Sequence, residues 1–190
     1  MSESTMAVKS APADRAVAGP LDVSESNPAQ PFIDLGALKI PPRETMQMRL
    51  EIEESTKRVV AVTLELAGST VQCQVFAAPR STGLWAEIRG QVAEQLSKQG
   101  GTSTEIDGPF GPELAAMVPV ADGAPRPVRF VGVDGPKWFL RGVISGPAAE
   151  GGVAATDIES VYRSLVVNRG TEPLPPRELL PMRVPQQPGA

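Results

Sequence analysis

Residues 128–146 read VRFVGVDGPKWFLRGVISG, and this stretch decides the fold. Two apolar runs, residues 128–133 and 138–145, flank the sequence DGPK, whose Asp-Gly pair is typical of a tight turn between antiparallel strands. We therefore expect a β-hairpin. If Gly135 and Pro136 form its loop, the facing pairs are Val133–Trp138, Val131–Leu140, Phe130–Arg141 and Arg129–Gly142. Apolar side chains then stand on both faces of the hairpin, as in the central strands of a sheet.

Three further strands precede this hairpin. Side chains alternate between apolar and polar with a period of two over residues 44–52, 58–66 and 71–78, and short polar segments join the three runs. Such spacing predicts an antiparallel meander in which Met46, Val62 and Val75 point inward.

Two segments have the helical period instead. Residues 84–96 place Leu84, Trp85, Ile88, Val92 and Leu96 on one stripe, and glycines follow at 100 and 101. Trp85 is therefore interpreted as a core residue. Gly90 interrupts this helix and is expected to mark a close approach to the sheet. The second helix is predicted over residues 156–167, where Thr156 and Glu159 have the spacing of a capping box.

The fold predicted from these elements is an α+β domain with a mainly antiparallel sheet. Its order is three strands, a helix, four strands, a helix and a short strand over residues 178–184. Both helices are expected to pack on one face of the sheet, which leaves the other face as a docking surface.

The ends of the chain differ from the middle in composition. Residues 1–30 are rich in Ala, Ser, Pro and charge and lack aromatic side chains, so they are expected to form a disordered leader. A single α+β domain is expected over residues 31–185, followed by a disordered tail at 186–190.

Composition excludes several kinds of chemistry. The 190-residue chain has no histidine, one cysteine and a formal net charge of −4. Without histidine, Ser-His-Asp and Cys-His catalysis and His-ligated zinc are excluded, and no cofactor or metal is expected. The lone Cys73 lies in a strand pattern and is interpreted as a buried apolar residue. No apolar run is long enough for a membrane span and no secretion signal is visible, so a cytoplasmic location is expected.

Three strings in this chain resemble a known family. VQCQVFAAPRSTGLWAEIRGQ (residues 71–91), GPFGPEL (108–114) and the hairpin string at 128–146 are similar to an actinobacterial family known only as domain of unknown function 3710. The similarity spans residues 33–184. It implies a cytoplasmic protein of unknown role, and it carries over no catalytic or binding residue.

The sharpest candidate site is a basic cluster on or near the hairpin. Its members are Arg126, Arg129, Lys137, Trp138 and Arg141. In the expected register Arg129 faces a glycine and is free to reach an anion, whereas Arg141 faces Phe130 and is placed to stack on that ring. The alternative is structural: both arginines pair with carboxylates of the sheet and extend to water.

The hypothesis that follows is a non-enzymatic binding or adaptor module for a protein or a small anionic partner. Two alternatives stay open. One is a histidine-free enzyme that uses arginines and carboxylates. The other, single-strand nucleic-acid binding on the sheet face, is disfavoured because only 4% of residues are aromatic and the net charge is negative. The sequence does not define an oligomeric state.

Overall fold

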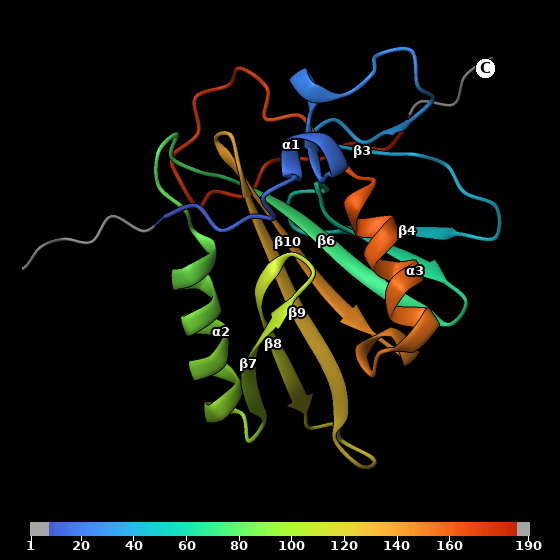
Figure 1. Ribbon diagram of the computed structural model, residues 1–190, viewed down its shortest axis with the longest axis vertical. Helices are drawn as coiled ribbons and strands as arrows, with labels where there is room; N and C mark the ends of the chain where they lie inside the picture. The colour runs from blue at the N-terminus through green and yellow to red at the C-terminus, as the bar shows by residue number, and fades with distance from the viewer. Residues whose placement is uncertain (1–7, 186–190) are drawn as a thin grey trace, which may run out of the picture.

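The computed structural model describes residues 8–185 and is built on a seven-stranded antiparallel sheet (Figure 1). The strand order across this sheet is β4-β5-β6-β10-β9-β8-β7. The strands are β4 (Gln47–Ile52), β5 (Val59–Leu66), β6 (Ser69–Ala77), β7 (Thr102–Gly108), β8 (Gly111–Val118), β9 (Arg126–Gly135) and β10 (Trp138–Ser145). Two longer helices, α2 (Trp85–Lys98) and α3 (Gly152–Arg163), pack on it, and a 3-10 turn, η2 (Pro147–Ala149), precedes α3.

A second, small sheet lies at one end of the large one. Its order is β1-β11-β3-β2, and the pair β1–β11 is parallel. The strands are β1 (Leu21–Asp22), β2 (Ile33–Asp34), β3 (Leu38–Ile40) and β11 (Val166–Val167). The α+β class and the mainly antiparallel pairing predicted from the sequence are thus confirmed. The expected strand over residues 178–184 is reduced to isolated bridges at Leu179 and Met182.

The hairpin forms in a register two residues away from the expected one. Trp138 pairs with Gly135, and Arg141 pairs with Gly132. The two residues between this pair, Pro136 and Lys137, form the loop. Lys137 adopts a left-handed backbone with φ +61°. Proline fits the first loop position, and the turn then needs a positive φ at the second, which lysine supplies here.

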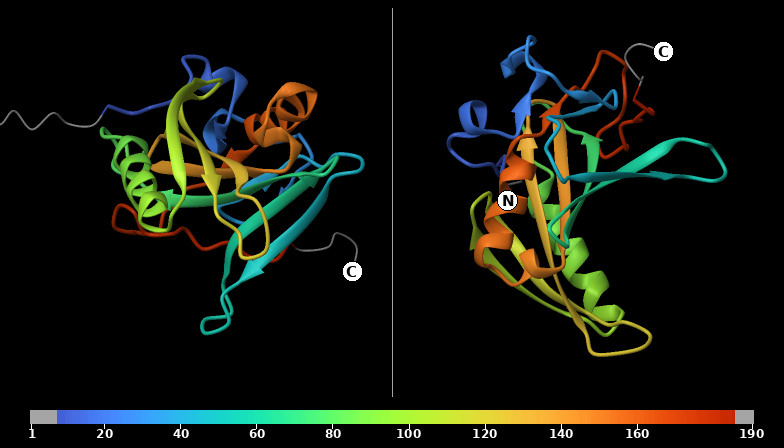
Figure 2. Two further views of the ribbon diagram at one scale, coloured as in Figure 1. Left: turned by 90° about the horizontal axis from the view of Figure 1, so that it is seen from below. Right: turned by 90° about the vertical axis from the view of Figure 1, so that its right-hand side faces the viewer.

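The two helices pack on opposite faces of the large sheet, so the prediction that both cover one face is wrong (Figure 2). Trp85 of α2 stacks on Phe139 with ring centroids 5.7 Å apart. Tyr162 of α3 donates a hydrogen bond to the carbonyl oxygen of Leu140, the next residue along β10. Since neighbouring residues of a strand face opposite sides, one helix lies on each face. Each helix buries its own hydrophobic cluster against the sheet.

Two glycines of the hairpin allow the aromatic rings to approach its backbone. A Cβ built on Gly132 would lie 2.5 Å from the Trp85 ring, and one on Gly142 would lie 2.9 Å from the Tyr162 ring. Gly90 of α2 behaves differently from the sequence interpretation, since nothing lies within 4 Å of a Cβ placed there. The glycines that permit close packing of helix and sheet therefore lie in the strands and not in the helix.

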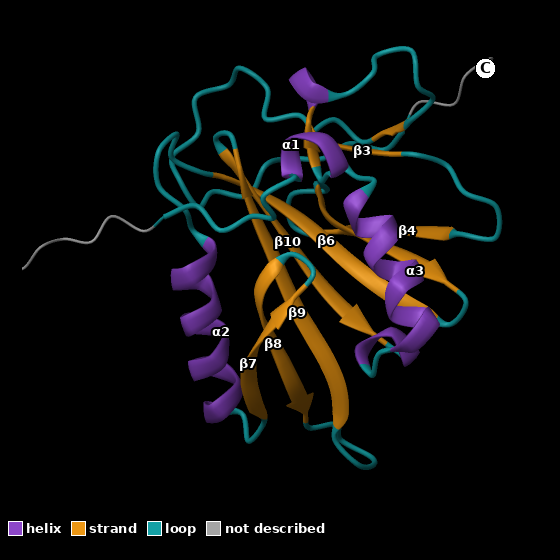
Figure 3. Cartoon of the chain, in the orientation of Figure 1, coloured by secondary structure: helices purple, strands orange, loops and turns teal. Residues whose placement is uncertain are grey.

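Residues 8–26 contact the rest of the fold where a disordered leader was expected, whereas residues 27–30 are exposed. We call residues 8–26 the N-terminal strap; it contains α1 (Arg15–Ala18), β1 and a 3-10 turn, η1 (Val23–Glu25) (Figure 3). The expectation of disorder was based on the small amount of apolar surface that this segment can bury. The strap is instead held by polar contacts, which are described below. The rest of the expected leader, residues 1–7, and the expected tail, residues 186–190, lie outside the described residues.

Candidate functional site

The structure does not bring the five predicted site residues together. Arg126 begins β9 and Lys137 stands in the turn at its other end, and both side chains are exposed. The other three residues are wholly or partly buried in separate environments. The hairpin therefore carries several distinct features instead of one basic cluster.

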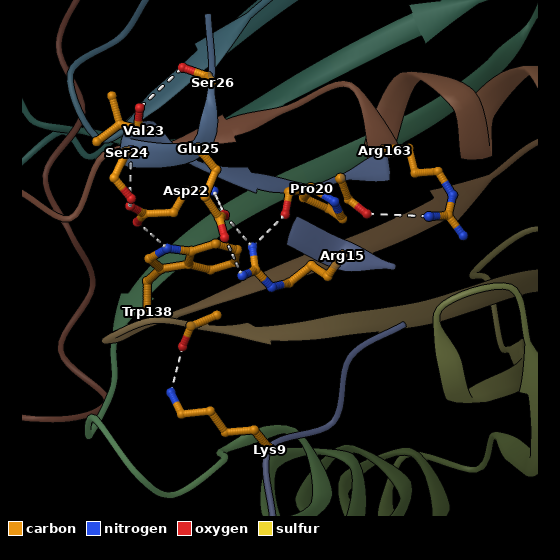
Figure 4. A network of polar contacts seen from close by, with 12 residues as sticks. Lys9, Arg15, Pro20, Asp22, Val23, Ser24, Glu25, Ser26, Trp138 and Arg163 are labelled. Atoms are coloured by element: carbon orange, nitrogen blue, oxygen red, sulfur yellow. Dashed lines mark hydrogen bonds and ion pairs between the residues drawn. The ribbon is translucent and has the colours of Figure 1, made fainter. Parts of the chain in front are cut away.

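Trp138 is fully buried beneath the N-terminal strap (Figure 4). Its indole Nε1 donates a hydrogen bond to Oδ1 of Asp22 at 2.9 Å. The guanidinium of Arg15 lies over the ring, 5.6 Å from its centroid, and is itself held by both carboxylate oxygens of Glu25 at 2.8 and 3.0 Å. Trp138 is thus an anchor for the strap, and its ring is not available to a ligand in this structure.

Asp134, near the end of β9, holds the strap and the start of α2 together. Its buried carboxylate accepts the backbone N–H of Ser10 at 2.9 Å and that of Leu84 at 2.8 Å. A carboxylate at this place suits the partial positive charge of a helix N-terminus. Lys9 donates to the carbonyl oxygens of Gly135 and Pro79, and burial lowers its pKa although the charge of Asp134 acts in the opposite direction.

Arg129 lies on the α3 face and is neutralised by two carboxylates. Its Nε and Nη2 donate to Glu113 at 2.6 and 2.9 Å, and Nη1 lies 3.6 Å from Glu159 of α3. Burial disfavours the charged form of Arg129, but the hydrogen bond and charge of Glu113, with Glu159, outweigh this and raise the pKa. The structural alternative weighed for Arg129 therefore fits the geometry, except that the pair is buried instead of extending to water.

Sequence reasoning did not single out Glu113, because the apolar alternation of its strand falls on the other face. Leu114 and Ala116 are buried on the α2 face, and Glu113 is only 1% exposed on the opposite face. A charged residue within an apolar strand could have signalled a buried partner, since buried charges are nearly always paired.

Arg141 lies on the opposite face, beside α2, and has no counter-ion among the residues that the structure describes. Its guanidinium stands over the ring of Phe130, 5.8 Å from the centroid, so the predicted stacking contact exists as a diagonal contact in the new register. The Nε atom is buried without a hydrogen-bond partner, and within residues 8–185 no carboxylate lies within ion-pair distance of the guanidinium. Burial lowers the pKa of Arg141.

A hollow of about 170 Å³ opens at this guanidinium, between α2 and the sheet. Its lining consists of Val92, Gln95, Leu96, Gln99, Phe130 and Arg141. This is an apolar floor with one cation and two carboxamides, and it includes no carboxylate. Gln95 and Gln99 are further members of the site that the sequence did not single out, because an exposed glutamine on a helix carries no signal of its own.

Three other hollows on the described residues differ from this one in charge. One of about 450 Å³ beside α3 includes Glu159, one of about 470 Å³ beside β2 includes Asp34 and Glu172, and one of about 420 Å³ beside η2 includes Glu150. Each also contains arginine, so cation and carboxylate face the same space. Of these four, the Arg141 hollow alone offers a positive charge that no lining carboxylate opposes.

Three further observations concern the described residues. Between residues 8 and 185 no three cysteine, aspartate or glutamate side chains gather closely enough to hold a metal ion. The Cys73 thiol is fully buried, and burial raises its pKa to about 12, so it is a poor nucleophile. No helix in this part of the chain is long and apolar enough to cross a membrane.

Comparison with known proteins gives one match. A family model described as "Protein of unknown function (DUF3710)" matches residues 19–190. No curated protein and no solved structure matches the chain.

Proposed function

Because the chain belongs to the DUF3710 family, whose description names no activity, we propose its role from the geometry: it is a binding module that holds a carboxylate at Arg141. The carboxylate belongs to a small molecule or to an acidic side chain of a protein partner. The role is recognition and not catalysis.

One observation carries this proposal: the half-buried guanidinium of Arg141 faces a hollow that no carboxylate lines, and its Nε has no hydrogen-bond partner among the described residues. A polar group that is removed from water without a partner costs about 1–3 kcal/mol, and more when it is charged. Arg129 avoids this cost through Glu113 and Glu159, whereas Arg141 does not. The planar fork of arginine matches a carboxylate, so such a ligand would supply the missing acceptors.

The surroundings of Arg141 favour a carboxylate over a nucleic acid. Binding of single strands needs exposed aromatic rings on which bases stack. The exposed large apolar side chains of the described residues are Val, Ile and Met, and Phe130 is only 8% exposed. A single cation on an apolar floor also gives little attraction for a chain of phosphates.

The proposal is tested by titrating the full-length protein with sodium acetate against sodium chloride at constant ionic strength. The readout is the NMR signal of the Arg141 Nε–H group, which has no hydrogen-bond partner within residues 8–185. We expect acetate, and not chloride, to shift this signal and the backbone amides of residues 92–99.

Arg141→Gln removes the guanidinium, and Arg126→Gln is its matched control, since it removes an exposed arginine with the same change in net charge. Hydrogen bonds to charged groups contribute about 1.5–3 kcal/mol, so Arg141→Gln should weaken acetate binding roughly 10- to 150-fold. Arg126→Gln should leave it unchanged. Equal loss in both variants, or no shift at Arg141 at acetate concentrations far above the millimolar range, would refute the proposal.

A further inference from the structure

From the surroundings of the Arg141 hollow we infer the class of its partner: an extended peptide segment with one acidic side chain, whose main chain is held by glutamine carboxamides. This inference rests on the proposed carboxylate site. It adds that the surface around Arg141 recognises peptide groups as well as charge.

The hollow lies where the side of α2 meets the surface of the sheet. Helix α2 packs mainly on β7, β8 and β9, and its Trp85 covers Phe139 of β10. Arg141 and Gln74, on the same face of β10 and β6, are only partly buried. Arg141 contacts the ring of Phe130 on β9, and both residues line the hollow. An occupant of the hollow therefore lies against the side of α2 and continues over this partly exposed part of β10 and β6.

Glutamines lie on two sides of Arg141, on α2 and on β6. Gln95 and Gln99 line the hollow from α2, and Gln74 is paired directly with Arg141 across the β6–β10 ladder. Gln72 follows two residues away on the same face of β6. Each carboxamide can donate two hydrogen bonds and accept two, as a peptide main chain both donates and accepts.

These carboxamides retain free hydrogen-bonding capacity. Within the part of the chain that the structure describes, the side chains of Gln95 and Gln99 make no hydrogen bond, and both are exposed. Gln74 donates to the carbonyl oxygen of Val60, and Gln72 donates to Glu51, so their carbonyl oxygens remain available.

The spacing on both sides matches an extended peptide. Residues four apart in a helix are separated by about 6 Å along its axis. Residues two apart in an extended chain are separated by about 6.6–6.8 Å, and they point the same way. Gln95 and Gln99 therefore have nearly the period at which a peptide repeats its main-chain groups, and Gln72 and Gln74 have that period on the strand side. A small carboxylate bound to Arg141 is too short to contact the glutamines of both α2 and β6.

The test compares acetate with capped pentapeptides on the full-length protein. The parent peptide is Gly-Ser-Asp-Ser-Gly; a second peptide carries Asn in place of Asp, and a third carries N-methyl groups on the two amides that flank Asp. We expect the parent to bind at least ten times more tightly than acetate. Loss of the charge should weaken binding roughly 10- to 150-fold, as expected for hydrogen bonds to a charged group, and loss of the flanking N–H donors should weaken it about three- to ten-fold.

The variant Gln95→Ala/Gln99→Ala should weaken binding of the parent peptide about three- to ten-fold and weaken acetate binding by a clearly smaller factor. Gln91→Ala is the matched control, because Gln91 lies one turn earlier on α2, bonds to Glu87 and does not line the hollow. Equal binding of the methylated and parent peptides, or an equal effect of the double variant on acetate and peptide, would overturn the inference while leaving the carboxylate site intact. Displacement of the peptide by a thymidine oligonucleotide would also overturn it, whereas loss of acetate binding itself would remove the proposed function.

Discussion

The buried ion pair of Arg129 provides a sharp test of the structural role assigned to that residue. The Glu113 side chain is 2% exposed and that of Arg129 is 9% exposed, with two hydrogen bonds of 2.6 and 2.9 Å between them. Arg129→Met keeps an unbranched apolar side chain and removes the guanidinium, so Glu113 is left buried without its counter-ion. Removing one partner of a buried pair typically costs 3–5 kcal/mol. Because Glu159 also loses its neighbour, we expect a loss of about 4 kcal/mol in the free energy of unfolding.

Equilibrium unfolding in urea measures this loss, with the free energy extrapolated linearly to water. Arg126→Met is the control on the same strand: its side chain is exposed, so it should change stability by less than about 0.5 kcal/mol. The double variant Arg129→Met/Glu113→Leu should recover to within about 1 kcal/mol of the parent, because an apolar pair of similar volume replaces a desolvated ion pair at little net cost. If Arg129→Met is as stable as Arg126→Met, or if the double variant is no better than the single one, the buried pair does not have the role assigned to it.

Other predictions follow from close packing and from titration. Gly132→Ala should destabilise the protein by roughly 1–3 kcal/mol, because its methyl group would overlap the indole of Trp85. Gly90→Ala should stabilise the protein by about 0.5–1 kcal/mol, because its methyl group meets open space and alanine favours the helix. Equilibrium unfolding in urea measures both changes. The folded pKa of Cys73, about 12, lies above its ordinary value of 9.0, so the folded state keeps a proton that the unfolded state releases. Stability should therefore fall as pH rises from 9 towards 12, and Cys73→Val should remove that part of the slope; an unchanged slope would contradict it. At pH 8 a thiol reagent should label Cys73 only after unfolding.

Much of the fold was predictable because strand alternation is a local property. The period of two along β5 and β6 identifies the buried residues Val62 and Val75 without knowledge of their neighbours. Met46 is only partly buried, since it lies beside an edge strand. The order of elements from β4 to α3 follows the predicted order for the same reason.

The helix faces were not predictable in this way. Both faces of β9 and β10 are apolar, so periodicity shows that the hairpin is central without showing which helix covers which face. Which face each helix covers depends on contacts between residues far apart in sequence. Examples are the stacking of Trp85 on Phe139 and the hydrogen bond from Tyr162 to the carbonyl oxygen of Leu140. The strap was missed for a related reason: Asp22 and Arg15 stabilise it by contacts with one ring of the distant hairpin, and composition gives no weight to single polar contacts.

The two hairpin arginines show why a candidate site has to be judged in three dimensions. In sequence Arg129 and Arg141 each stand among apolar residues of a strand, and Arg129 was the one expected to be free to reach an anion. In the observed register they face opposite sides of the sheet, and α3 and β8 bring two carboxylates to Arg129, whereas α2 brings only carboxamides and apolar groups to Arg141. A buried charge with internal partners stabilises the fold, and one without them is satisfied best by a ligand. The difference in neighbours, and not in the residues themselves, gives Arg129 a structural role and is the basis for the proposal that Arg141 binds a ligand.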